Sequence, residues 1–321
     1  MIICWPNVSI WIDTSTNMDY KMPLPLDVII EFERTSASPL EYDWEMVLEN
    51  GYRQFLDSGS TVLDVGGHVG RHAAIFIYGI HCDQIRIFEP LPEQNKFLSS
   101  RFSASENVKV FPFALASVNG ETEFVINHKS PEESGIKERI YNDPALKELE
   151  KTIVPMRRLD DLNLDVQRID YIKVDAEGGE IDIIKGAKHI LKKFKPILSV
   201  EYGLSSYTAY GYSRTTLFEL FESLDYTLCD LFGNSFDAEQ WDNVVDRFYW
   251  DYYAVANENL PTFQRKMGTK VFDELERCRF LNPGESDIVI AKDKAQSSKL
   301  REIFIRFFHS SLKKSKRFPP T

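Results

Sequence analysis

The segment Thr61-Val-Leu-Asp-Val-Gly-Gly-His-Val-Gly70 is the most informative part of this 321-residue chain for its fold class. An apolar run ends at Asp64, a glycine cluster provides a turn, and the helix-like segment His72-Ala-Ala-Ile-Phe-Ile-Tyr78 follows. A second apolar run, Arg86-Ile-Phe88, leads directly to Glu89. This order is typical of a nucleoside-binding βαβ unit, in which glycines let the backbone approach the ligand and a later carboxylate accepts hydrogen bonds from a ribose diol.

The glycine pattern distinguishes between nucleoside cofactors. A dinucleotide site uses G-x-G-x-x-G, and neither Gly66 nor Gly67 begins such a motif. Asp64 lies two residues before the turn, where a carboxylate repels a pyrophosphate but suits a cationic or amine-bearing ligand. The pattern therefore favours S-adenosylmethionine over NAD. The alternative is an ordinary tight strand–helix turn, which would leave the position of Glu89 a coincidence.

A second informative stretch runs from Arg168 to Ala187. It predicts a strand from Tyr171 to Val174, a turn that carries Asp175 and Glu177, and a helix. Glu180 is interpreted as an acid of the first helical turn, where the macrodipole favours negative charge. The apolar stripe of the predicted helix consists of Ile181, Ile184, Ala187 and Leu191.

Four acids follow predicted strands: Asp64, Glu89, Asp175 and Glu201, the last after the short run Lys195-Pro-Ile-Leu-Ser-Val. Ligands of open parallel sheets bind outside the carboxyl ends of the strands. Like charges at one edge repel each other, so a purely structural reason for four acids there is hard to find. The sequence therefore predicts a ligand site at this edge.

The same motifs resemble those of the FkbM family of S-adenosylmethionine-dependent methyltransferases, over about residues 40 to 256. The resemblance implies an α/β class I methyltransferase fold, Rossmann-like, with a seven-stranded and mostly parallel sheet, helices on both faces and an antiparallel last strand. It also implies methyl transfer to a hydroxyl, often on a sugar, a glycolipid or a polyketide product. The motifs that carry the resemblance are Asp64-Val-Gly-Gly-His-Val-Gly70, Phe88-Glu-Pro90, Leu159-Asp-Asp161, Ile172-Lys-Val-Asp-Ala-Glu-Gly-Gly-Glu180, Gly186-Ala187 and Pro196-Ile-Leu-Ser-Val-Glu201.

Together, the motifs and the resemblance give a set of expected cofactor contacts. The family usually has asparagine where this chain has His68, so the contact made by that side chain is open. Phe113 and Ala114 are expected to face the adenine, with plain packing at a strand end as the alternative. The expected cofactor-binding residues are Asp64, Gly66, Gly67, His68, Gly70, Glu89, Pro90, Phe113, Ala114 and Asp175.

Methyl transfer to an alcohol requires alignment of the oxygen with the methyl group and a base for the proton. Asp175 is the first candidate for the base, with Glu177 and Glu201 as its catalytic partners and His68 as a further candidate. A carboxylate beside other carboxylates is expected to have a raised pKa. Alternatively, two or three of these acids hold Mg²⁺ or Ca²⁺, which would acidify the hydroxyl. No metal ligand is assigned.

Two further segments are candidates for the acceptor site. Residues 127–152 are turn-rich and charged, which predicts a lid over the pocket or, alternatively, a solvated loop. Beyond Glu201, aromatic side chains are expected either to stack on an acceptor or to cap the core. These aromatic residues are Tyr202, Tyr207, Tyr210 and Tyr212.

Composition predicts a cytoplasmic enzyme. The chain is 43% hydrophobic and 27% charged, and its net charge of −11 argues against nucleic acid as a partner. No apolar run reaches the roughly 20 residues that span a bilayer. The four cysteines show no metal or disulfide spacing and are expected to be reduced thiols: Cys4, Cys82, Cys229 and Cys278.

Three regions are expected along the chain: a β-rich extension over 1–38, a methyltransferase domain over 39–256, and a helical extension over 257–321. The last contains an amphipathic stripe with a basic face, which predicts peripheral contact with an anionic membrane or a lipid-linked acceptor; the alternative is a helix docked on the core. The stripe consists of Leu300, Ile303, Phe304, Phe307, Phe308 and Leu312.

The favoured function is O-methylation of a small-molecule or glycan acceptor. A nicotinamide-dependent oxidoreductase is the first alternative, although the G-x-G-x-x-G motif is missing. The second is a non-catalytic relative that binds a cofactor or a glycan, in which His68 would mark a decayed site. Retention of the four strand-end acids argues against such decay.

Overall fold

The computed structural model describes residues 4–5, 8–9, 44–129, 134–137, 148–245 and 249–267. The chain divides into two compact units, one of residues 1–51, 232–234 and 262–321, and one of residues 52–231 and 235–261. In the first unit, β1 (Cys4–Trp5) and β2 (Val8–Ser9) pair as antiparallel strands. The remainder of the predicted β-rich extension before residue 38 and the basic C-terminal stripe lie outside the described residues.

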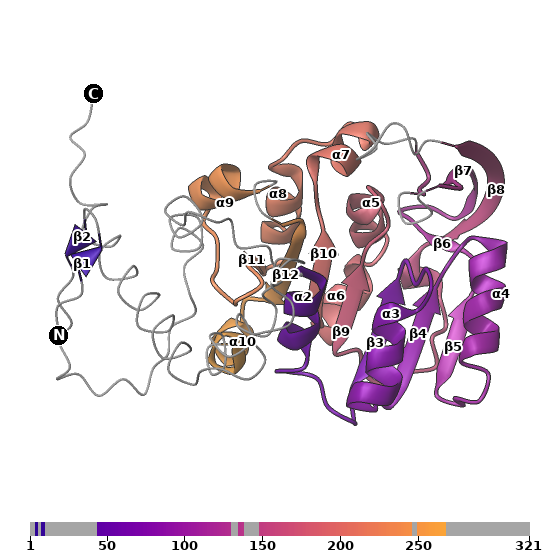
Figure 1. The fold of residues 1–321 in the computed structure, drawn as a ribbon, viewed down its shortest axis with the longest axis horizontal. Helices are drawn as coiled ribbons and strands as arrows, with labels where there is room; N and C mark the ends of the chain where they lie inside the picture. The colour runs from indigo at the N-terminus through magenta and orange to yellow at the C-terminus, as the bar shows by residue number, and fades with distance from the viewer. Residues whose placement is uncertain are drawn as a thin grey trace. The chain divides into compact units, whose positions relative to one another are not determined.

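The second unit is built on a seven-stranded sheet of order β11-β12-β10-β9-β3-β4-β5 (Figure 1). Only β12 runs antiparallel to its neighbours, which confirms the predicted mostly parallel sheet with an antiparallel last strand. The inner strands β3 and β9 are buried along their whole length, as expected for apolar runs covered on both faces. The strands are β3 (Thr61–Val65), β4 (Gln84–Phe88), β5 (Val108–Phe111), β9 (Tyr171–Val174), β10 (Ile197–Glu201), β11 (Tyr226–Cys229) and β12 (Asp251–Ala256).

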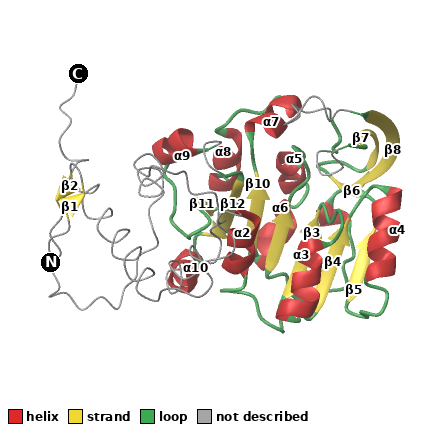
Figure 2. Ribbon diagram, in the orientation of Figure 1, coloured by secondary structure: helices red, strands yellow, loops and turns green. Residues whose placement is uncertain are grey.

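Helices cover both faces of this sheet, as predicted (Figures 1 and 2). In the view of Figure 1, α3 lies in front of the sheet and α6 behind it. The helical elements of this unit are α3 (Arg71–Ala74) with its π-helical continuation η1 (Ile75–Ile80), α4 (Pro92–Arg101), η4 (Leu159–Asp161), α5 (Glu180–Lys185), α6 (Lys188–Phe194), α7 (Leu204–Tyr207), η5 (Thr208–Tyr210), α8 (Thr216–Glu222) and α9 (Ala238–Val244). Most of α2 (Trp44–Tyr52) and of α10 (Leu260–Met267) belongs to the first unit.

The helix predicted after Glu180 is in fact two helices, α5 and α6, which break at Gly186. A Cβ atom on Gly186 would lie 2.1 Å from the carbonyl oxygen of Ala116, so any residue other than glycine would clash at this position. The backbone N–H of Asp160 donates to the Gly186 carbonyl, and the Asp160 carboxylate accepts from two N–H groups in the first turn of α6. The Leu159-Asp-Asp161 and Gly186-Ala187 motifs therefore form a structural joint.

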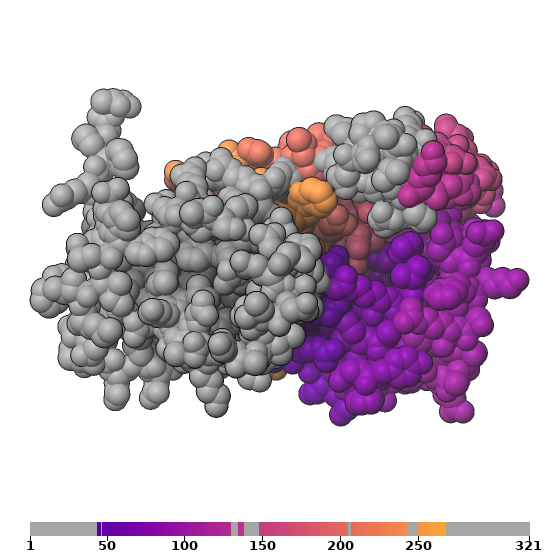
Figure 3. Space-filling model, viewed as in Figure 1, coloured from indigo at the N-terminus to yellow at the C-terminus, as the bar shows by residue number. Residues whose placement is uncertain are grey.

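A second, three-stranded sheet interrupts the core between β5 and β9. Its order is β6 (Ala114–Leu115), β8 (Leu149–Arg157) and β7 (Gly120–Asn127), with β6 parallel and β7 antiparallel to β8. Its apolar cluster contains Ala114 and reaches Leu91 at the start of α4. In the space-filling view, the magenta surface of this small sheet adjoins the violet surface of the β3–β5 half of the unit (Figure 3).

Two further predictions concern the described residues. None of the helices in the described segments combines the length and the apolar character needed to cross a bilayer. Cys82 and Cys229 are buried free thiols, and burial raises the pKa of Cys82 to about 12. Both thiols are therefore neutral near pH 7 and unreactive.

Candidate active site

The glycine turn after β3 adopts left-handed backbone conformations that depend on its sequence. Gly66 has φ +82° and Gly70 has φ +76°. A Cβ atom on Gly66 would lie 1.7 Å from the backbone oxygen of Asp175, and one on Gly67 would lie 2.3 Å from Ile87. The turn is therefore pressed directly against the end of β9, and only glycine permits this approach.

Glu89 follows β4 and is oriented by the same turn. Its Oε2 accepts from the backbone N–H of His68 and its Oε1 from that of Leu91, both at 2.9 Å. The carboxylate has about four acceptor sites, so each oxygen can accept one more hydrogen bond. Burial raises the pKa of Glu89 to about 7, although both backbone donors oppose the shift. This geometry fits a ribose diol.

His68 contributes its backbone to this arrangement. Its φ of 42° lies in the left-handed region, which asparagine and histidine adopt far more readily than most other residues. The backbone requirement explains why histidine can stand where related sequences usually have asparagine. The His68 N–H contact to Glu89 does not depend on the side chain, so the substitution leaves this contact intact.

Asp64 lies within β3 rather than after it and is only 2% exposed. Its Oδ1 has no hydrogen-bond partner among the described residues. Burial raises the pKa of Asp64, and the nearby Lys173 ammonium opposes this shift. A buried carboxylate oxygen with unused acceptor capacity, two residues before the glycine turn, fits a ligand that carries an amino group.

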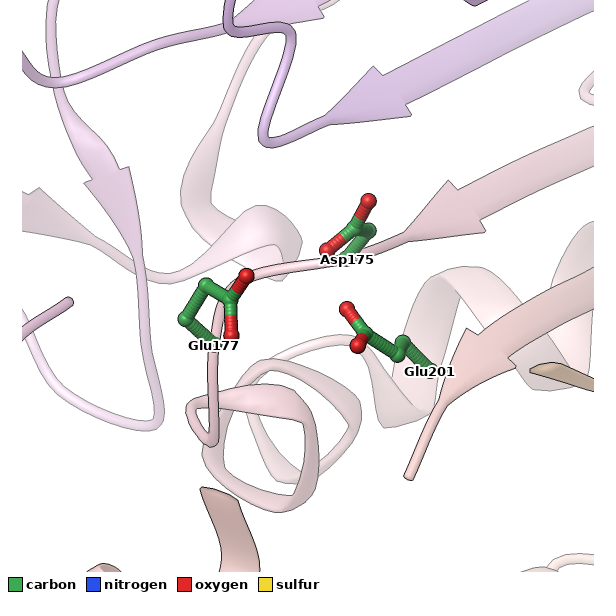
Figure 4. A group of neighbouring side chains, drawn as sticks. All are labelled: Asp175, Glu177 and Glu201. Atoms are coloured by element: carbon green, nitrogen blue, oxygen red, sulfur yellow. The ribbon is translucent and has the colours of Figure 1, made fainter. Parts of the chain in front are cut away.

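Three carboxylates meet beyond β9 and β10: Asp175, Glu177 and Glu201. One oxygen from each lies within 4.8 Å of the others, and Figure 4 shows the side chains converging from the β9 turn and the β10 end. Asp175 and Glu201 are hydrogen-bonded to each other, so this pair shares a proton. The structure thus brings together the residues that the sequence proposed for catalysis.

Lys173 organises this pair, a role that the sequence analysis missed. Its side chain is 3% exposed, and its Nζ donates to Asp175 Oδ2 at 2.6 Å. Burial alone would raise the pKa of Asp175, but Lys173 and the hydrogen bond from Glu201 together lower it. The sequence feature that could have indicated this role is the single lysine in the otherwise apolar strand Tyr171–Val174.

The raised pKa expected for Asp175 belongs instead to Glu201. Burial, followed by the negative charge of Asp175, raises the pKa of Glu201 well above its usual value. Of the two carboxyl groups, Asp175 therefore loses its proton first, and Glu201 holds the proton that the pair shares. The asymmetry arises because Lys173 forms its ion pair with Asp175.

Glu180 shapes the turn that carries these acids. Its Oε1 accepts from the backbone N–H groups of Ala176 and Gly178, at 3.0 and 2.9 Å. The turn contains left-handed conformations at Glu177 (φ 53°) and Gly178 (φ 105°). Glu180 is 1% exposed, and burial raises its pKa to about 7. Its role is therefore more specific than that of an acid favoured by the helix dipole.

Of the two residues expected to face adenine, Phe113 follows β5 and Ala114 begins β6. The half-buried Phe113 ring lies 5.9 Å from Phe88 and 5.6 Å from Phe111, measured between ring centroids. Ala114 is buried in the apolar cluster of the small sheet, and Pro90 is half-buried. Phe113 therefore stands near the strand that leads to Glu89.

The four tyrosines beyond β10 divide into two pairs. Tyr202 and Tyr207 are buried and stack on each other at 4.7 Å, so they cap the core. Tyr210 and Tyr212 are half-buried, and a lysine ammonium lies over each ring, 4.9 and 4.7 Å from the centroid. Burial raises the pKa of Tyr210 and Tyr212, so both hydroxyls stay protonated.

Comparison with solved structures finds several methyltransferases. A methyltransferase FkbM from Methylobacillus flagellatus KT is 15% identical, over 71% of this chain and 58% of that one, with a TM-score of 0.39. A SAM dependent methyltransferase from Aquifex aeolicus is 13% identical, over 72% and 97%, with a TM-score of 0.36. M. jannaschii TYW2 in complex with AdoMet is 9% identical, over 66% and 75%, with a TM-score of 0.34. The chain thus spans 58% of the first of these proteins.

No curated protein matches the chain. The family model for the methyltransferase FkbM domain matches residues 64–231, which is more than half of the sequence and runs from Asp64 through the acid turn to the end of β11. This match counts against a nicotinamide-dependent oxidoreductase. The chain belongs to the FkbM family of S-adenosylmethionine-dependent methyltransferases.

Proposed function

We propose that the protein transfers a methyl group from S-adenosylmethionine to a hydroxyl of a sugar, a glycolipid or a secondary metabolite. The observation that carries this proposal is the contact between the glycine turn and the acid turn. The Gly66 backbone packs on the Asp175 carbonyl, so a paired carboxylate lies directly beside the cradle expected for the cofactor. An acceptor hydroxyl placed between them would be within reach of a base.

Cofactor binding is assigned to the residues around the glycine turn. Glu89 would accept hydrogen bonds from the ribose diol, and the unpartnered Asp64 oxygen would accept one from the amino group. Gly66, Gly67 and Gly70 let the backbone approach the ligand. His68 would contribute through its backbone N–H, Phe113 and Ala114 would face the adenine, and Pro90 would bind the cofactor beside Glu89.

When bound, S-adenosylmethionine supplies an electrophilic methyl group whose sulfonium leaves as a neutral thioether. The protein has to hold the acceptor oxygen in line and to accept its proton as the new C–O bond forms and the C–S bond breaks. Asp175 is ionised and accepts that proton. Glu201 is protonated and holds Asp175 by a hydrogen bond. Glu177 lines the same space (Figure 4).

A bound divalent cation is the competing arrangement, and the 4.8 Å separation of the three acids is the observation that favours it. Two features favour the proton-sharing pair instead. Lys173 already neutralises Asp175 at 2.6 Å, and Glu201 carries a proton that a cation would have to displace. Transfer should therefore continue in EDTA, and loss of activity that Mg²⁺ or Ca²⁺ restores would assign the acids to a metal.

The proposal extends to the organisation of the whole chain. We propose that residues 39–256 form the methyltransferase domain and that residues 1–38 and 257–321 are extensions of it. We also propose a cytoplasmic location, which the buried free thiols of Cys82 and Cys229 support.

The experiment that tests the function is calorimetric titration with S-adenosylhomocysteine, with NADH in parallel. Micromolar binding of S-adenosylhomocysteine alone is expected, and Glu89→Ala should abolish it. Glu93→Ala, which removes an exposed acid from the first turn of α4, is the matched control and should bind normally. Transfer of a labelled methyl group to a panel of p-nitrophenyl glycosides then tests the acceptor class. Binding of NADH, or of neither ligand, would refute the assignment.

A further inference from the structure

Residues Ser134–Lys137, here called the strap, are the described middle part of the charged insertion between β7 and β8. One side of the strap is fastened to β7. Val125 and Gly135 exchange two backbone hydrogen bonds, at 2.8 and 3.1 Å, and form an antiparallel bridge. The Ser134 hydroxyl oxygen accepts from the Asn127 backbone N–H at 3.0 Å. These bonds therefore attach Ser134 and Gly135, at one end of the strap, to strand β7 of the small sheet.

The other side of the strap is fastened by Tyr210. The Tyr210 hydroxyl oxygen accepts from the Lys137 backbone N–H at 3.2 Å. The Lys137 ammonium lies over the same ring, 4.9 Å from its centroid. Tyr210 ends η5, which follows β10 and Glu201 in the chain. One side chain thus links the strap to the segment beyond the β10 carboxylate.

Between these two anchors the strap crosses the acid turn. A Cβ atom on Gly135 would lie 3.1 Å from the backbone oxygen of Glu177 and 3.4 Å from its Cβ, so the two backbones are in close contact. Ile136 packs against the apolar cluster that contains Leu91 and Ala114. Figure 1 shows the small sheet and α7, which precedes η5, at the same end of the large sheet.

We propose that Tyr210 is a positioning residue that holds the strap over the Asp175–Glu180 turn, so that the strap forms one wall of the acceptor site. This inference rests on the proposed function, which puts the acceptor hydroxyl beside Asp175, in the turn that the strap contacts at Glu177. The cofactor is expected around Gly66, whose backbone contacts the Asp175 carbonyl, whereas the strap contacts Glu177. Release of the strap should therefore weaken acceptor binding and leave cofactor binding unchanged.

Tyr210→Phe tests the proposal, because it keeps the ring under the lysine and removes only the hydroxyl that accepts from the strap backbone. Hydrogen exchange of the full chain should become about five- to tenfold faster in peptides that cover the strap, as expected for one lost hydrogen bond. Thr208→Val is the matched control, since the Thr208 hydroxyl donates to Leu204 within the same segment and does not contact the strap. This control should leave exchange in the strap unchanged.

The functional measurement uses the p-nitrophenyl glycoside that the wild-type protein methylates. Tyr210→Phe should raise its KM about fivefold, while kcat and the affinity for S-adenosylhomocysteine stay within about twofold of the wild type. Gly135→Ala, which displaces the strap from the Glu177 side, should show the same split.

Three results would overturn the proposal. Exchange that is unchanged in Tyr210→Phe, or equally faster in Thr208→Val, would show that Tyr210 does not hold the strap. Faster exchange with an unchanged KM would show that the strap is no wall of the acceptor site. A wild-type protein that binds no S-adenosylhomocysteine would refute the proposed function and the acceptor wall with it, and the exchange data would still report on the Tyr210 contact.

Discussion

The Lys173 ammonium donates to the Asp175 carboxylate at 2.6 Å, from a side chain that is 3% exposed. The same lysine lies opposite Asp64 in the register of β9 and β3. One buried cation therefore stands between the carboxylate next to the glycine turn and the carboxylate proposed as the base. A buried ion of this kind is costly unless both charges are satisfied, so the three residues form one electrostatic unit.

Removal of this cation should abolish catalysis and weaken the fold. Lys173→Met should lower methyl transfer at least about a hundredfold, because Asp175 is then no longer held in its ionised form. It should also lower the free energy of unfolding by about 3 kcal/mol, because the buried Asp175 carboxyl group loses its ion pair. Denaturant unfolding and initial rates measure both effects.

The double variant Lys173→Met/Asp175→Asn is the control for this prediction. It removes both charges, so most of the stability should return while activity stays lost. If the double variant is as unstable as Lys173→Met, the loss comes from packing and the ion pair is not its cause.

The pKa of Glu89 predicts a pH dependence of cofactor binding. Burial raises this pKa from 4.5 to about 7, and the ionised form is the better acceptor for two ribose hydroxyls. The affinity for S-adenosylhomocysteine should therefore rise as the pH increases through about 7. Calorimetry between about pH 6 and pH 8 measures it. Glu89→Gln should bind weakly and with no such dependence; a wild-type affinity that is flat over this range would refute the assignment.

Glu180 should make stability depend on pH in the opposite sense to a salt-bridged acid. Its folded pKa is raised from 4.5 to about 7, so the folded state binds a proton over this interval that the unfolded state does not. The contribution of Glu180 to the free energy of unfolding is at most about 3 kcal/mol. It is fully present below pH 4.5 and is lost as the pH rises through about 7. Glu180→Gln should flatten this part of the unfolding profile. An unchanged profile would place the titration elsewhere.

A pair of glycine substitutions separates backbone strain from steric contact. Gly66 and Gly211 have similar φ values of 82° and 77°. A Cβ atom on Gly66 would overlap the Asp175 oxygen at 1.7 Å, whereas one on Gly211 would meet nothing within 4 Å. Gly211→Ala should therefore cost only about 1 kcal/mol of unfolding free energy. Gly66→Ala should cost several-fold more and abolish S-adenosylhomocysteine binding; equal costs would show that the turn is not pressed on β9.

Position 68 should tolerate asparagine and reject a β-branched residue. His68→Asn keeps a side chain that favours a φ near 42°, and the backbone N–H to Glu89 is retained. S-adenosylhomocysteine affinity should stay within about threefold of the wild type. His68→Val should lower stability by about 1–2 kcal/mol and weaken binding. A large loss of affinity in His68→Asn would instead assign a direct ligand contact to the imidazole.

Much of the architecture was predictable from local patterns. The strands that contain or precede Asp64, Glu89, Asp175 and Glu201 are short, mostly apolar runs, and a parallel sheet places their carboxyl ends at one edge. The helix after Glu180 was predicted as one element because its apolar stripe continues through Ala187. The break lies where Gly186 passes the carbonyl of Ala116 and Asp160 caps α6, contacts with residues distant in sequence that periodicity cannot reveal.

The protonation of the site was less predictable. Neighbouring acids indicate that one pKa must rise, but their order in the chain does not say which. In the structure it is the pKa of Glu201 that is raised, because Lys173 forms its ion pair with Asp175. A lysine inside an apolar strand shows its role only when its neighbours in the sheet are known.

Features that depend on neighbouring residues can be read from the sequence: the buried strands, the left-handed turn that glycine and His68 permit, and the acids at or near the strand ends. The fold sets which carboxyl group of the pair holds the proton, how closely the glycine turn approaches Asp175, and where Tyr210 contacts the strap. Backbone propensities act over a few residues, whereas burial, Coulomb interactions and van der Waals contact depend on distances between atoms that the fold alone brings together.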